Sequence, residues 1–405
     1  MKKVIIIGGG ASGLACAITS ARLGNEVLII DKNKNVGKKI LVTGNGRCNY
    51  FNEDFTTSHY TSYNGELLED IITNDNKYDV LEFFDSLGIV PNIKNGYYYP
   101  SSSQAVSIQN ILYTECKLNN VKFNFEEVVN NVTYNNGFTV YTNKGKYNCD
   151  KVVIATGSRA LYDTEVECIG YDIAKSFGHK IKPVLPGLTK LNGNETFFKE
   201  WNGIRTDASL ELYFNDQYVR SERGEIQLTS NGISGICTMT LSNYAVHFIN
   251  NKDNVYVKIN FLDFLDIHTS IEFIDFIKNR NSKLHGRTIS ELFDGVINYK
   301  LSNLLLKLAK INLDDKVINL EDSKLLLLGE LFTSFKLNID SYSGFKDAQI
   351  CTGGVSLEEV NVHTFESKKQ RGLYIIGEVL DVSGDCGGYN LGFAWLSGIK
   401  AGADI

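Results

Sequence analysis

A glycine-rich turn directly follows the first apolar segment of the chain. Residues 4–7 are apolar and of strand length, Gly8-Gly9-Gly10-Ala11-Ser12-Gly13 comes next, and a helix is expected over 14–23. At this spacing the first glycine permits a tight turn, the second lets backbone amides approach a pyrophosphate, and the third lets the helix pack close to the strand. The turn therefore predicts a dinucleotide site with the phosphates at the N-terminus of the helix.

The residues after this helix complete the same unit. Gly24 is a helix-ending residue, and residues 26–30 are apolar enough for a second buried strand. Asp31 comes at the end of that strand, where a carboxylate can accept a hydrogen bond from a ribose hydroxyl. Because strand, turn, helix, second strand and acid occur in this order, glycines that serve packing alone are the less favoured interpretation.

A third strand ends in small residues that let the backbone approach a ligand. Residues 150–154 are suited to a buried strand, and Ala155-Thr156-Gly157 follows them. The stretch 121–141 before this strand contains short alternating segments, of which 121–125 is the first, and the hairpin signal Asn135-Asn136-Gly137. We therefore predict a β-meander that leads back to the first domain.

The C-terminal part of the chain repeats the strand–turn–helix pattern. A strand is expected over 372–376, Gly387-Gly388 lies in the turn, and a helix is expected over 391–403. A helix N-terminus with exposed amides after a glycine pair can stabilise negative charge. In a flavoprotein that charge would be the N1/C2-oxygen edge of the reduced ring, and Asp381 would contact the ribityl chain. The alternative is a surface strand–turn–helix that only closes a sheet.

Length and composition exclude several classes of protein. The 405 residues suffice for two or three domains, and a net charge of -6 argues against a general binder of nucleic-acid backbones. The eight cysteines are scattered, without a Cys-x-x-Cys pair or a cysteine–histidine cluster, which predicts reduced thiols and no metal site. Because a strand begins within four residues of Met1 and no apolar stretch could span a bilayer, we expect a cytoplasmic protein without a membrane partner.

Several motifs together resemble one bacterial family of FAD-dependent oxidoreductases, the aminoacetone oxidase and bile-acid 3-dehydro-reductase-like flavoproteins, which have two dinucleotide-binding folds. The resemblance extends over the whole chain. Asp31 is one departure, because a longer glutamate is common there in the family. The matching motifs are the glycine turn of 8–24, the segments 37–49, 98–101, 231–235 and 353–355, and the segment 377–391.

The resemblance implies an α/β fold assembled from both chain ends. A Rossmann-type FAD-binding domain with a β-meander would comprise residues 1–190 and 345–405. A domain inserted between them, residues 191–344, would be β-rich over 191–262 and helical over 263–344. Within it, the alternation of residues 210–214 and 255–259 predicts strands, and the periodicity of 271–279 and 301–309 predicts helices.

The resemblance also implies which residues contact FAD, which would be bound without a covalent link. Arg47 is the charged residue of most interest, because a guanidinium can pair with pyrophosphate or stabilise a reduced flavin; a surface arginine is the alternative. Cys48 has no second cysteine within a few residues, so a buried core thiol is favoured over a redox thiol. The expected contacts are Gly8, Gly10, Ala11, Ser12, Gly13, Asp31, Lys32, Lys39, Gly44, Arg47, Cys48, Asn49, Val129, Ala155, Thr156, Gly157, Gly377, Glu378, Asp381, Gly387, Gly388, Asn390 and Leu391.

The family activities leave three functions open. The first is a reductase of a small molecule that passes hydride from NAD(P)H through FAD to an acceptor such as a conjugated enone. The second is an amine oxidase that uses oxygen, and the third is a flavin-binding or RNA-associated module without catalysis. The chain has no second Gly-x-Gly-x-x-Gly unit, so NAD(P)H would visit the flavin transiently. Tyr97-Tyr98-Tyr99-Pro100 and Trp395 could wall a flat substrate pocket or pack in the core, and the six isolated histidines are expected to be structural or solvated.

Overall fold

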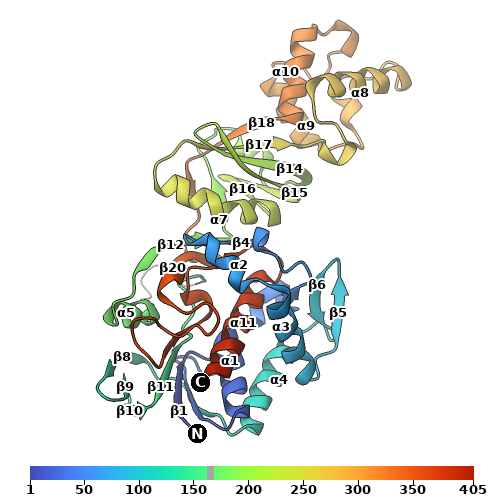
Figure 1. Cartoon of the computed structure of the whole chain (residues 1–405). Helices are drawn as coiled ribbons and strands as arrows, with labels where there is room; N and C mark the ends of the chain where they lie inside the picture. The colour runs from blue at the N-terminus through green and yellow to red at the C-terminus, as the bar shows by residue number, and fades with distance from the viewer. Residues whose placement is uncertain (162–167) are drawn as a thin grey trace. The chain divides into compact units, whose positions relative to one another are not determined.

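The chain divides into two units in this computed structural model, which describes residues 1–161 and 168–405. The first unit consists of Met1–Leu185 and Ile350–Ile405, and the second unit is Pro186–Gln349. Both chain ends therefore belong to the first unit, as the blue and red elements of Figure 1 show. The sequence-based boundaries, 190/191 and 344/345, both lie inside the second unit.

A five-stranded parallel sheet forms the centre of the first unit. β1 lies in its middle, with Ile7 opposite Ile154 on one side and Ile30 on the other. The side chains of residues 4–7 are buried, as expected for a parallel strand that is covered on both faces. Ligands of such sheets bind beyond the carboxyl ends of the strands, and here these ends come from three separate parts of the chain. In spatial order the strands are β21 (Leu373–Ile375), β11 (Lys151–Ile154), β1 (Lys3–Ile7), β2 (Glu26–Ile30) and β7 (Lys122–Asn124).

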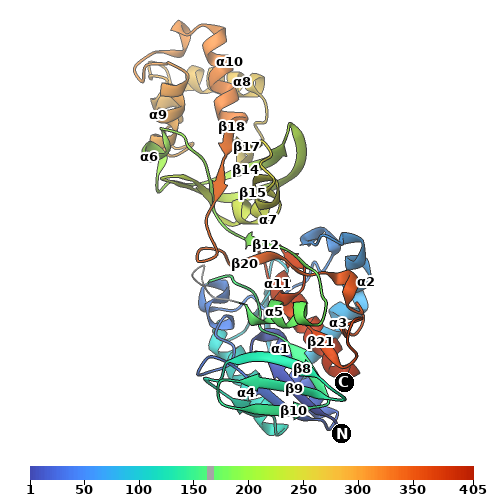
Figure 2. The same ribbon diagram turned by 90° about the vertical axis from the view of Figure 1, so that its left-hand side faces the viewer.

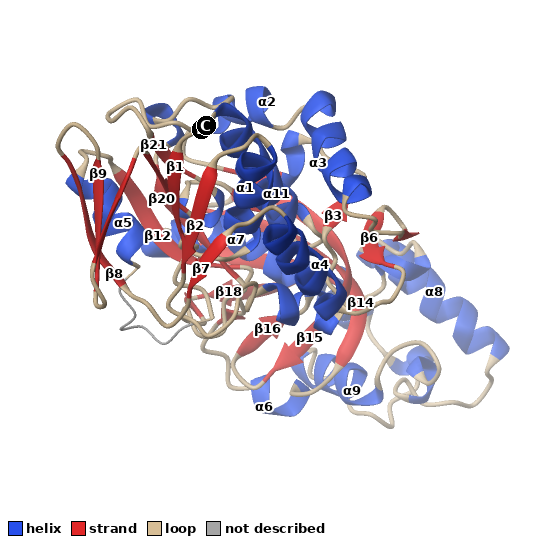
Figure 3. Ribbon diagram, turned by 90° about the horizontal axis from the view of Figure 1, so that it is seen from below, coloured by secondary structure: helices blue, strands red, loops and turns tan. Residues whose placement is uncertain are grey.

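Helices cover one face of this sheet, and two of them pack unusually close together (Figure 3). A Cβ atom on Gly398 would lie 2.3 Å from the carbonyl oxygen of Ser12, and one on Gly402 would lie 2.7 Å from that of Cys16. Only glycine fits there, because α1 and α11 approach backbone to backbone. The helices of this unit are α1 (Ala11–Arg22), α2 (Leu68–Ile71), α3 (Asn74–Ser86), α4 (Ala105–Leu118), α5 (Ile169–Ser176) and α11 (Tyr389–Asp404).

A three-stranded antiparallel meander, β8 to β10, covers the other face (Figures 2 and 3). The segment 121–125, which the sequence assigns to this meander, is instead the edge strand β7 beside β2. The assignment was wrong because α4 precedes this segment and returns the chain, so the next strand runs parallel to β2. The remaining strands of the unit are β3 (Phe51–Asn52), β4 (Tyr60–Thr61), β5 (Pro91–Lys94), β6 (Tyr97–Pro100), β8 (Val129–Tyr134), β9 (Phe138–Thr142), β10 (Lys146–Cys149), β12 (Ile181–Gly187), β20 (Ile350–Val355) and β22 (Ser383–Gly384).

The second unit contains a seven-stranded antiparallel sheet with helices. Its apolar strand residues alternate in burial, with Leu210 and Leu212 in the core, because one face of the sheet packs inward. The strands, in spatial order, are β18 (Phe335–Ile339), β17 (Val255–Asn260), β14 (Arg205–Phe214), β15 (Gln217–Thr229), β16 (Gly232–Ser234), β13 (Leu191–Asn192) and β19 (Ser341–Tyr342).

Two parts of the second unit depart from the sequence-based division into a β-rich and a helical half. α7 lies in the first half and packs on the sheet, whereas β18 lies in the second half and pairs with β17, Val255 opposite Ile339. Among the described residues, no helix has both the length and the apolar character that crossing a membrane requires. The helices are α6 (Phe198–Trp201), α7 (Ile236–Asn250), α8 (Ser270–Lys283), α9 (Tyr299–Leu308) and α10 (Asp322–Thr333).

Candidate cofactor site

Of the three fingerprint glycines in the first turn, Gly8, Gly10 and Gly13, the protein itself requires two, and the third has an open side. A Cβ atom on Gly8 would lie 2.4 Å from the carbonyl oxygen of Ala155, and one on Gly13 would lie 2.0 Å from that of Gly8. Gly10 differs, because a Cβ atom there would have no heavy atom within 4 Å and the φ of Gly10 is an ordinary -79°. The open side of Gly10 therefore leaves room for a ligand that approaches the backbone.

The start of α1 is suited to an anionic ligand. Gly10 caps the helix without a side-chain hydrogen bond, and Ala11, Ser12 and Gly13 form its first turn. Backbone amides of a first turn have no partner within the helix and carry partial positive charge. The dinucleotide fingerprint thus has the geometry that a pyrophosphate needs.

Asp31 is held beside this turn by the end of β2. Its Oδ2 accepts a hydrogen bond from the backbone amide of Gly9 at 2.7 Å, and its Oδ1 accepts one from the amide of Asn33 at 2.7 Å. Oδ1 also accepts from Asn33 Nδ2 at 2.8 Å, whereas Oδ2 has a further lone pair, so Asp31 can also accept from a ribose hydroxyl. Lys32 follows Asp31 and is exposed. The amide of Glu127 donates to the Asp31 carbonyl at 3.1 Å, which brings the buried Val129, two residues further on, to this part of the unit.

The strand ends of β11 and β21 lie next to the first turn. The amide of Ala155 donates to the carbonyl of Ile7 at 2.9 Å, and that of Ile376 donates to the carbonyl of Ile154 at 3.0 Å. Gly377 follows directly, and a Cβ atom on it would lie 2.5 Å from Ser12 Oγ in the first turn of α1. Residues from both chain ends thus lie at one edge of the sheet.

An ion pair connects the segment after β2 with the C-terminal strand end. Lys39 Nζ lies 3.1 Å from Glu378 Oε2, and Glu378 Oε1 accepts from the amide of Cys351 at 3.3 Å. Gly157, whose φ is +70°, lies close to Glu378, since a Cβ atom on it would be 3.8 Å from Oε2. The Thr156 hydroxyl lies beside these groups and donates to the Gly157 carbonyl at 3.4 Å. Four of the expected contact residues therefore lie together.

The second glycine turn comes before α11 and is bound on one side by residues 49–52. Gly387 and Gly388 have φ values of +133° and +94°, which favour glycine. Asn52 Nδ2 donates to the Gly387 carbonyl at 2.9 Å, and a Cβ atom on Gly388 would lie 2.7 Å from the Phe51 carbonyl oxygen. Asn390, which precedes Leu391 in the first turn of α11, exchanges two 2.8 Å hydrogen bonds with the backbone of Gly384. Asn390 therefore supports the turn.

Asp381 is a deeply buried carboxyl group before this turn. Its side chain is 1% exposed, and its Oδ2 accepts from the amide of Tyr63 at 2.8 Å and from Ser62 Oγ at 3.0 Å. Burial raises the pKa of Asp381 to about 7, although these two hydrogen bonds oppose the shift. A carboxyl group that changes protonation near neutral pH can either donate to or accept from a sugar-like hydroxyl.

The segment 44–49 brings one unsatisfied polar atom to the second turn. Asn49 Oδ1 is buried without a hydrogen-bond partner among the described residues, and a Cβ atom on Gly388 would lie 3.0 Å from it. Such an atom is suited to a ligand that donates a hydrogen bond. Together with the open side of Gly10, Asn49 shows that the residues present fit a dinucleotide with a polar ring.

Arg47 and Cys48 have different environments within this segment. Arg47 is exposed, its Nε donates to the Gly44 carbonyl at 3.4 Å, and its guanidinium lies 5.7 Å from the Tyr99 ring centroid. Cys48 is fully buried, and burial raises the pKa of its thiol to about 11. Cys48 is therefore a protonated core thiol at neutral pH, in agreement with the favoured interpretation of its sequence.

Two of the aromatic residues that could either wall a pocket or pack in the core are core residues. Trp395 is fully buried and donates from Nε1 to the Tyr50 carbonyl at 2.9 Å. Tyr98 is also buried and lies 6.0 Å, centroid to centroid, from the Tyr50 ring. Both residues fill the core, since aromatic side chains contribute most of their energy there. Tyr97 and Tyr99 are half-buried.

One cluster of charged residues beside the second turn is not recognisable in the sequence. His59 lies between Asp54 and Asp385, with one ring nitrogen 2.9 Å from each carboxylate. His59 and Asp385 are 326 positions apart, so no spacing pattern could indicate the contact. The sequence signal that comes closest is the position of Asp385 two residues before the glycine pair.

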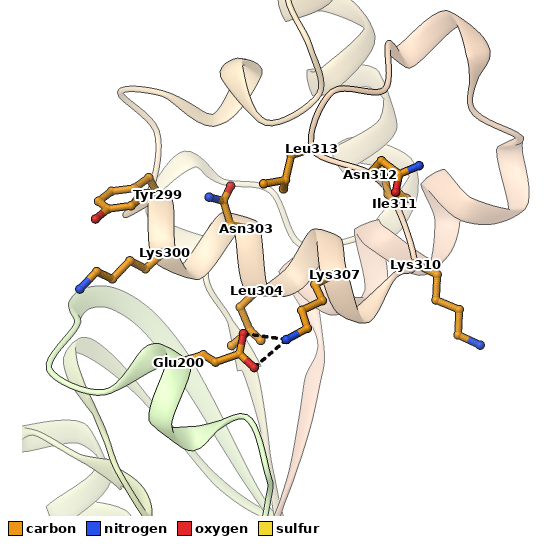
Figure 4. A pocket seen from close by; sticks show the side chains of 10 residues that line it. All are labelled: Glu200, Tyr299, Lys300, Asn303, Leu304, Lys307, Lys310, Ile311, Asn312 and Leu313. Atoms are coloured by element: carbon orange, nitrogen blue, oxygen red, sulfur yellow. Dashed lines mark hydrogen bonds and ion pairs between the residues drawn. The ribbon is translucent and has the colours of Figure 1, made fainter.

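The second unit contains an open hollow of about 730 Å³, which Figure 4 shows. Lys307 of α9 pairs there with Glu200 of α6, with Nζ 2.8 Å and 3.0 Å from the two carboxylate oxygens. The hollow is lined by Glu200, Tyr299, Lys300, Asn303, Leu304, Lys307, Lys310, Ile311, Asn312 and Leu313.

Among residues 1–161 and 168–405, no three acidic, histidine or cysteine side chains gather in a way that could hold a metal ion.

Comparison with known proteins identifies the family. The family model described as the HI0933-like protein Rossmann domain matches residues 2–404. The chain belongs to the HI0933-like Rossmann family. The resemblance to FAD-dependent oxidoreductases that the motifs carry is thereby confirmed, as is the Rossmann-type fold.

Two relatives and one solved structure match nearly the whole chain. Identity is 34% to the 3-dehydro-bile acid delta(4,6)-reductase of Clostridium scindens over 405 residues, 99% of this chain and 98% of the relative. Identity is 28% to the ribosomal RNA dihydrouridine synthase of Escherichia coli over 403 residues, 99% of this chain and 97% of the relative. One solved structure is that of a 3-ketosteroid-delta4-(5alpha)-dehydrogenase from Rhodococcus jostii RHA1, with a TM-score of 0.50 and 12% identity. The match covers 99% of this chain and 96% of the dehydrogenase chain. That last likeness concerns the fold alone.

Proposed function

We propose that this protein is a reductase that uses non-covalently bound FAD to pass hydride from NADH or NADPH to a carbon–carbon double bond conjugated with a carbonyl group. The observation that carries the proposal is the arrangement of two glycine turns, from opposite chain ends, in one unit. FAD supplies the hydride-accepting and hydride-donating chemistry when it is bound. The protein itself has to bind, orient and electrostatically tune its reactants.

The distance between the two turns suits an extended dinucleotide such as FAD. Gly398 of α11 packs on Ser12 in the first turn of α1, and Tyr389 begins α11 nine residues earlier. At 1.5 Å per residue, the start of α11 lies about 14 Å along the helix from this contact. A ribityl chain followed by a ring system can bridge such a span, with its phosphates at α1 and its ring near α11.

Each part of the ligand then has a chemically suited residue. The amides of the first turn of α1 would bind the pyrophosphate, and Asp31 would accept from the adenosine ribose. Asp381, buried near the second turn, would bind ribityl hydroxyls. The amides after Gly387 and Gly388 would stabilise the negative charge that develops on the ring edge.

The relatives support the class of acceptor. A delta(4,6)-reductase of a 3-dehydro bile acid, and a dihydrouridine synthase, are both named for saturating a carbon–carbon double bond in a ring that also carries a carbonyl group. The shared chemistry favours reduction over amine oxidation for this chain. Uridine in RNA is a second candidate acceptor because of the 28% identical relative, although the net charge of -6 argues against it.

Anaerobic stopped-flow spectroscopy of the FAD-loaded protein tests the proposal. Mixing with NADH or NADPH is expected to bleach the oxidised-flavin band, and a steroid with a 3-oxo-4-ene group is then expected to restore it. Restoration by a uridine-containing ribosomal RNA fragment, and not by the steroid, would favour the second candidate. Bleaching by an amine, with none by either nicotinamide nucleotide, would overturn the proposed reductase.

A further inference from the structure

The imidazole of His59 is partly buried and forms hydrogen bonds with two carboxylates at once. Nδ1 lies 2.9 Å from Asp385 Oδ2, and Nε2 lies 2.9 Å from Asp54 Oδ2. When both carboxylates are ionised they only accept hydrogen bonds, so both ring nitrogens have to donate and this geometry favours the imidazolium form. The hydrogen bond to Asp385, more than the bond to Asp54, raises the pKa of His59 above its usual value, although partial burial opposes the shift.

The residues that His59 contacts flank the second glycine turn on both sides. Asp385 comes before Gly387-Gly388, and Tyr389 comes directly after it as the first residue of α11. The His59 ring stacks on the Tyr389 ring with centroids 4.4 Å apart and planes at 16°. The amide of Asp385 also donates to the His59 carbonyl at 2.9 Å. Ring and backbone of His59 therefore hold both ends of the turn.

The neighbouring residues extend this contact along the chain. Tyr60 pairs with Gly384 in the ladder between β4 and β22, and the Tyr60 hydroxyl donates to the Tyr389 carbonyl at 3.0 Å. Thr61 Oγ1 lies 2.6 Å from Ser383 Oγ. The segment of residues 59–63 is thus hydrogen-bonded to the segment before α11 at successive positions, with His59 at the end nearest the glycine pair.

When protonated, His59 places a positive charge directly between the carboxylates of Asp54 and Asp385. Asp385 is 4% exposed, so its charge is poorly screened by water, whereas the Asp54 side chain is 60% exposed and has Lys77 near it. The phenols of Tyr60 and Tyr389 also face the cluster, and burial raises the pKa of Tyr60 well above its usual value. Without the imidazolium, a buried carboxylate three residues before Gly388 would oppose the positive potential of the α11 N-terminus.

We propose that His59 is a positioning residue that fixes the second glycine turn and compensates the Asp385 charge, and so favours the reduced form of a flavin bound at that turn. The inference rests on the proposed FAD site and deepens it, since it assigns the control of flavin potential to a residue outside the glycine motifs. His59 acts through Asp385 and Tyr389.

The test is the midpoint potential of the FAD-loaded wild type and of His59→Gln between pH 6 and pH 10. Glutamine keeps a hydrogen-bond donor but removes the charge. Below the raised pKa of His59, the variant is expected to have a ratio of reduced to oxidised protein about tenfold lower at the same potential, equivalent to about 30 mV for a two-electron couple. Above that pKa the wild type loses its imidazolium, so the two potentials are expected to converge.

A second variant keeps the test decisive if His59→Gln does not fold. Asp54→Asn alters a mostly exposed side chain and leaves the bond between His59 and Asp385 in place. Removing one carboxylate lowers the pKa of His59, so the pH at which the wild-type potential falls off is expected to move down in Asp54→Asn.

The outcomes distinguish failure of the role of His59 from failure of the proposed FAD site. Potentials that are equal at every pH, or a difference that does not change with pH, would overturn the role of His59 while leaving the FAD site intact. An unchanged pH profile in Asp54→Asn would do the same. Failure of the wild type to bind FAD at all would instead overturn the proposed function, and the role of His59 with it.

Discussion

The two glycine turns of the first unit each lead into a helix, but different residues hold them. The turn at Gly8–Gly13 takes backbone hydrogen bonds from residues close to it in the chain, such as Ile30, whose carbonyl accepts from the Gly8 amide at 2.9 Å, although Ala155 and Gly377 also pack on it. The turn at Gly387-Gly388 depends on distant residues, since Asn52 and Gly387 are 335 positions apart. The backbone of the first turn is thus hydrogen-bonded to its own neighbourhood, whereas the second turn combines the nearby Asn390 with residues 49–52 from the other end of the chain.

The largest loss of stability is expected from a side chain added inside the first turn. In Gly13→Val, the added Cβ atom would lie 2.0 Å from the Gly8 carbonyl oxygen, and neither backbone segment can yield. We expect a loss of more than about 4 kcal/mol in the free energy of unfolding, measured with urea on the FAD-free protein. A stable Gly13→Val protein that binds FAD normally would show that the first turn tolerates rearrangement.

The buried carboxyl group of Asp381, before the second turn, is expected to make the free energy of unfolding depend on pH. Asp381 has a pKa of about 7 in the folded protein against 3.8 as the ordinary value, so its protonated form is the one that folding favours. Its contribution to stability is therefore complete at acidic pH and is lost as the pH rises from about 4 to about 7, by about 4 kcal/mol in all. Asp381→Asn should become more stable relative to wild type over that interval, as urea unfolding at each pH would measure. A pH-independent difference would contradict the raised pKa.

Asn52 tests how much a single distant contact supports the second turn. Asn52→Ala removes the hydrogen bond to the Gly387 carbonyl and leaves that partly buried acceptor without this donor. We expect a loss of about 1–2 kcal/mol in stability and a similar loss in FAD binding, about tenfold in dissociation constant. Isothermal titration with FAD measures the second quantity. Unchanged binding would mean that the turn is as self-sufficient as the first.

The smallest effect is expected outside both turns, in the hollow of the second unit. Lys307 and Glu200 form an ion pair whose side chains are 67% and 46% exposed. Lys307→Met should change stability by less than about 1 kcal/mol and leave the FAD dissociation constant unchanged. Weaker FAD binding in this variant would extend the cofactor site beyond the first unit.

The difference between the turns also explains what the sequence can predict. β1, α1, β2 and Asp31 follow one another within 31 residues, so the order of apolar run, glycines and acid suffices to place them. The edge strand β7 was misassigned because the same alternation suits a meander and a sheet edge, and only the preceding helix decides between them. Trp395 was equally ambiguous, since burial depends on partners such as Tyr50 that are far away in the chain.

The contacts of the second turn lie beyond sequence reasoning for a related physical reason. The pairs His59–Asp385 and Ser62–Asp381 join residues more than 300 positions apart, and nothing in either local sequence indicates a partner. A histidine that is isolated in the chain is therefore not isolated in the fold. The resemblance to known flavoproteins indicated Asp381 and the glycine pair, but it gave no reason to single out His59.

FAD binding by Gly10→Ala is the most direct test of the central claim, that the open side of the first turn is built for a pyrophosphate. The added methyl group meets no atom of the protein within 4 Å, so the stability of the FAD-free protein should stay within about 1 kcal/mol of wild type. The methyl group would occupy the space of the ligand, and FAD should bind at least about tenfold more weakly. An unchanged FAD dissociation constant, in a protein of unchanged stability, would contradict a cofactor bound at this turn.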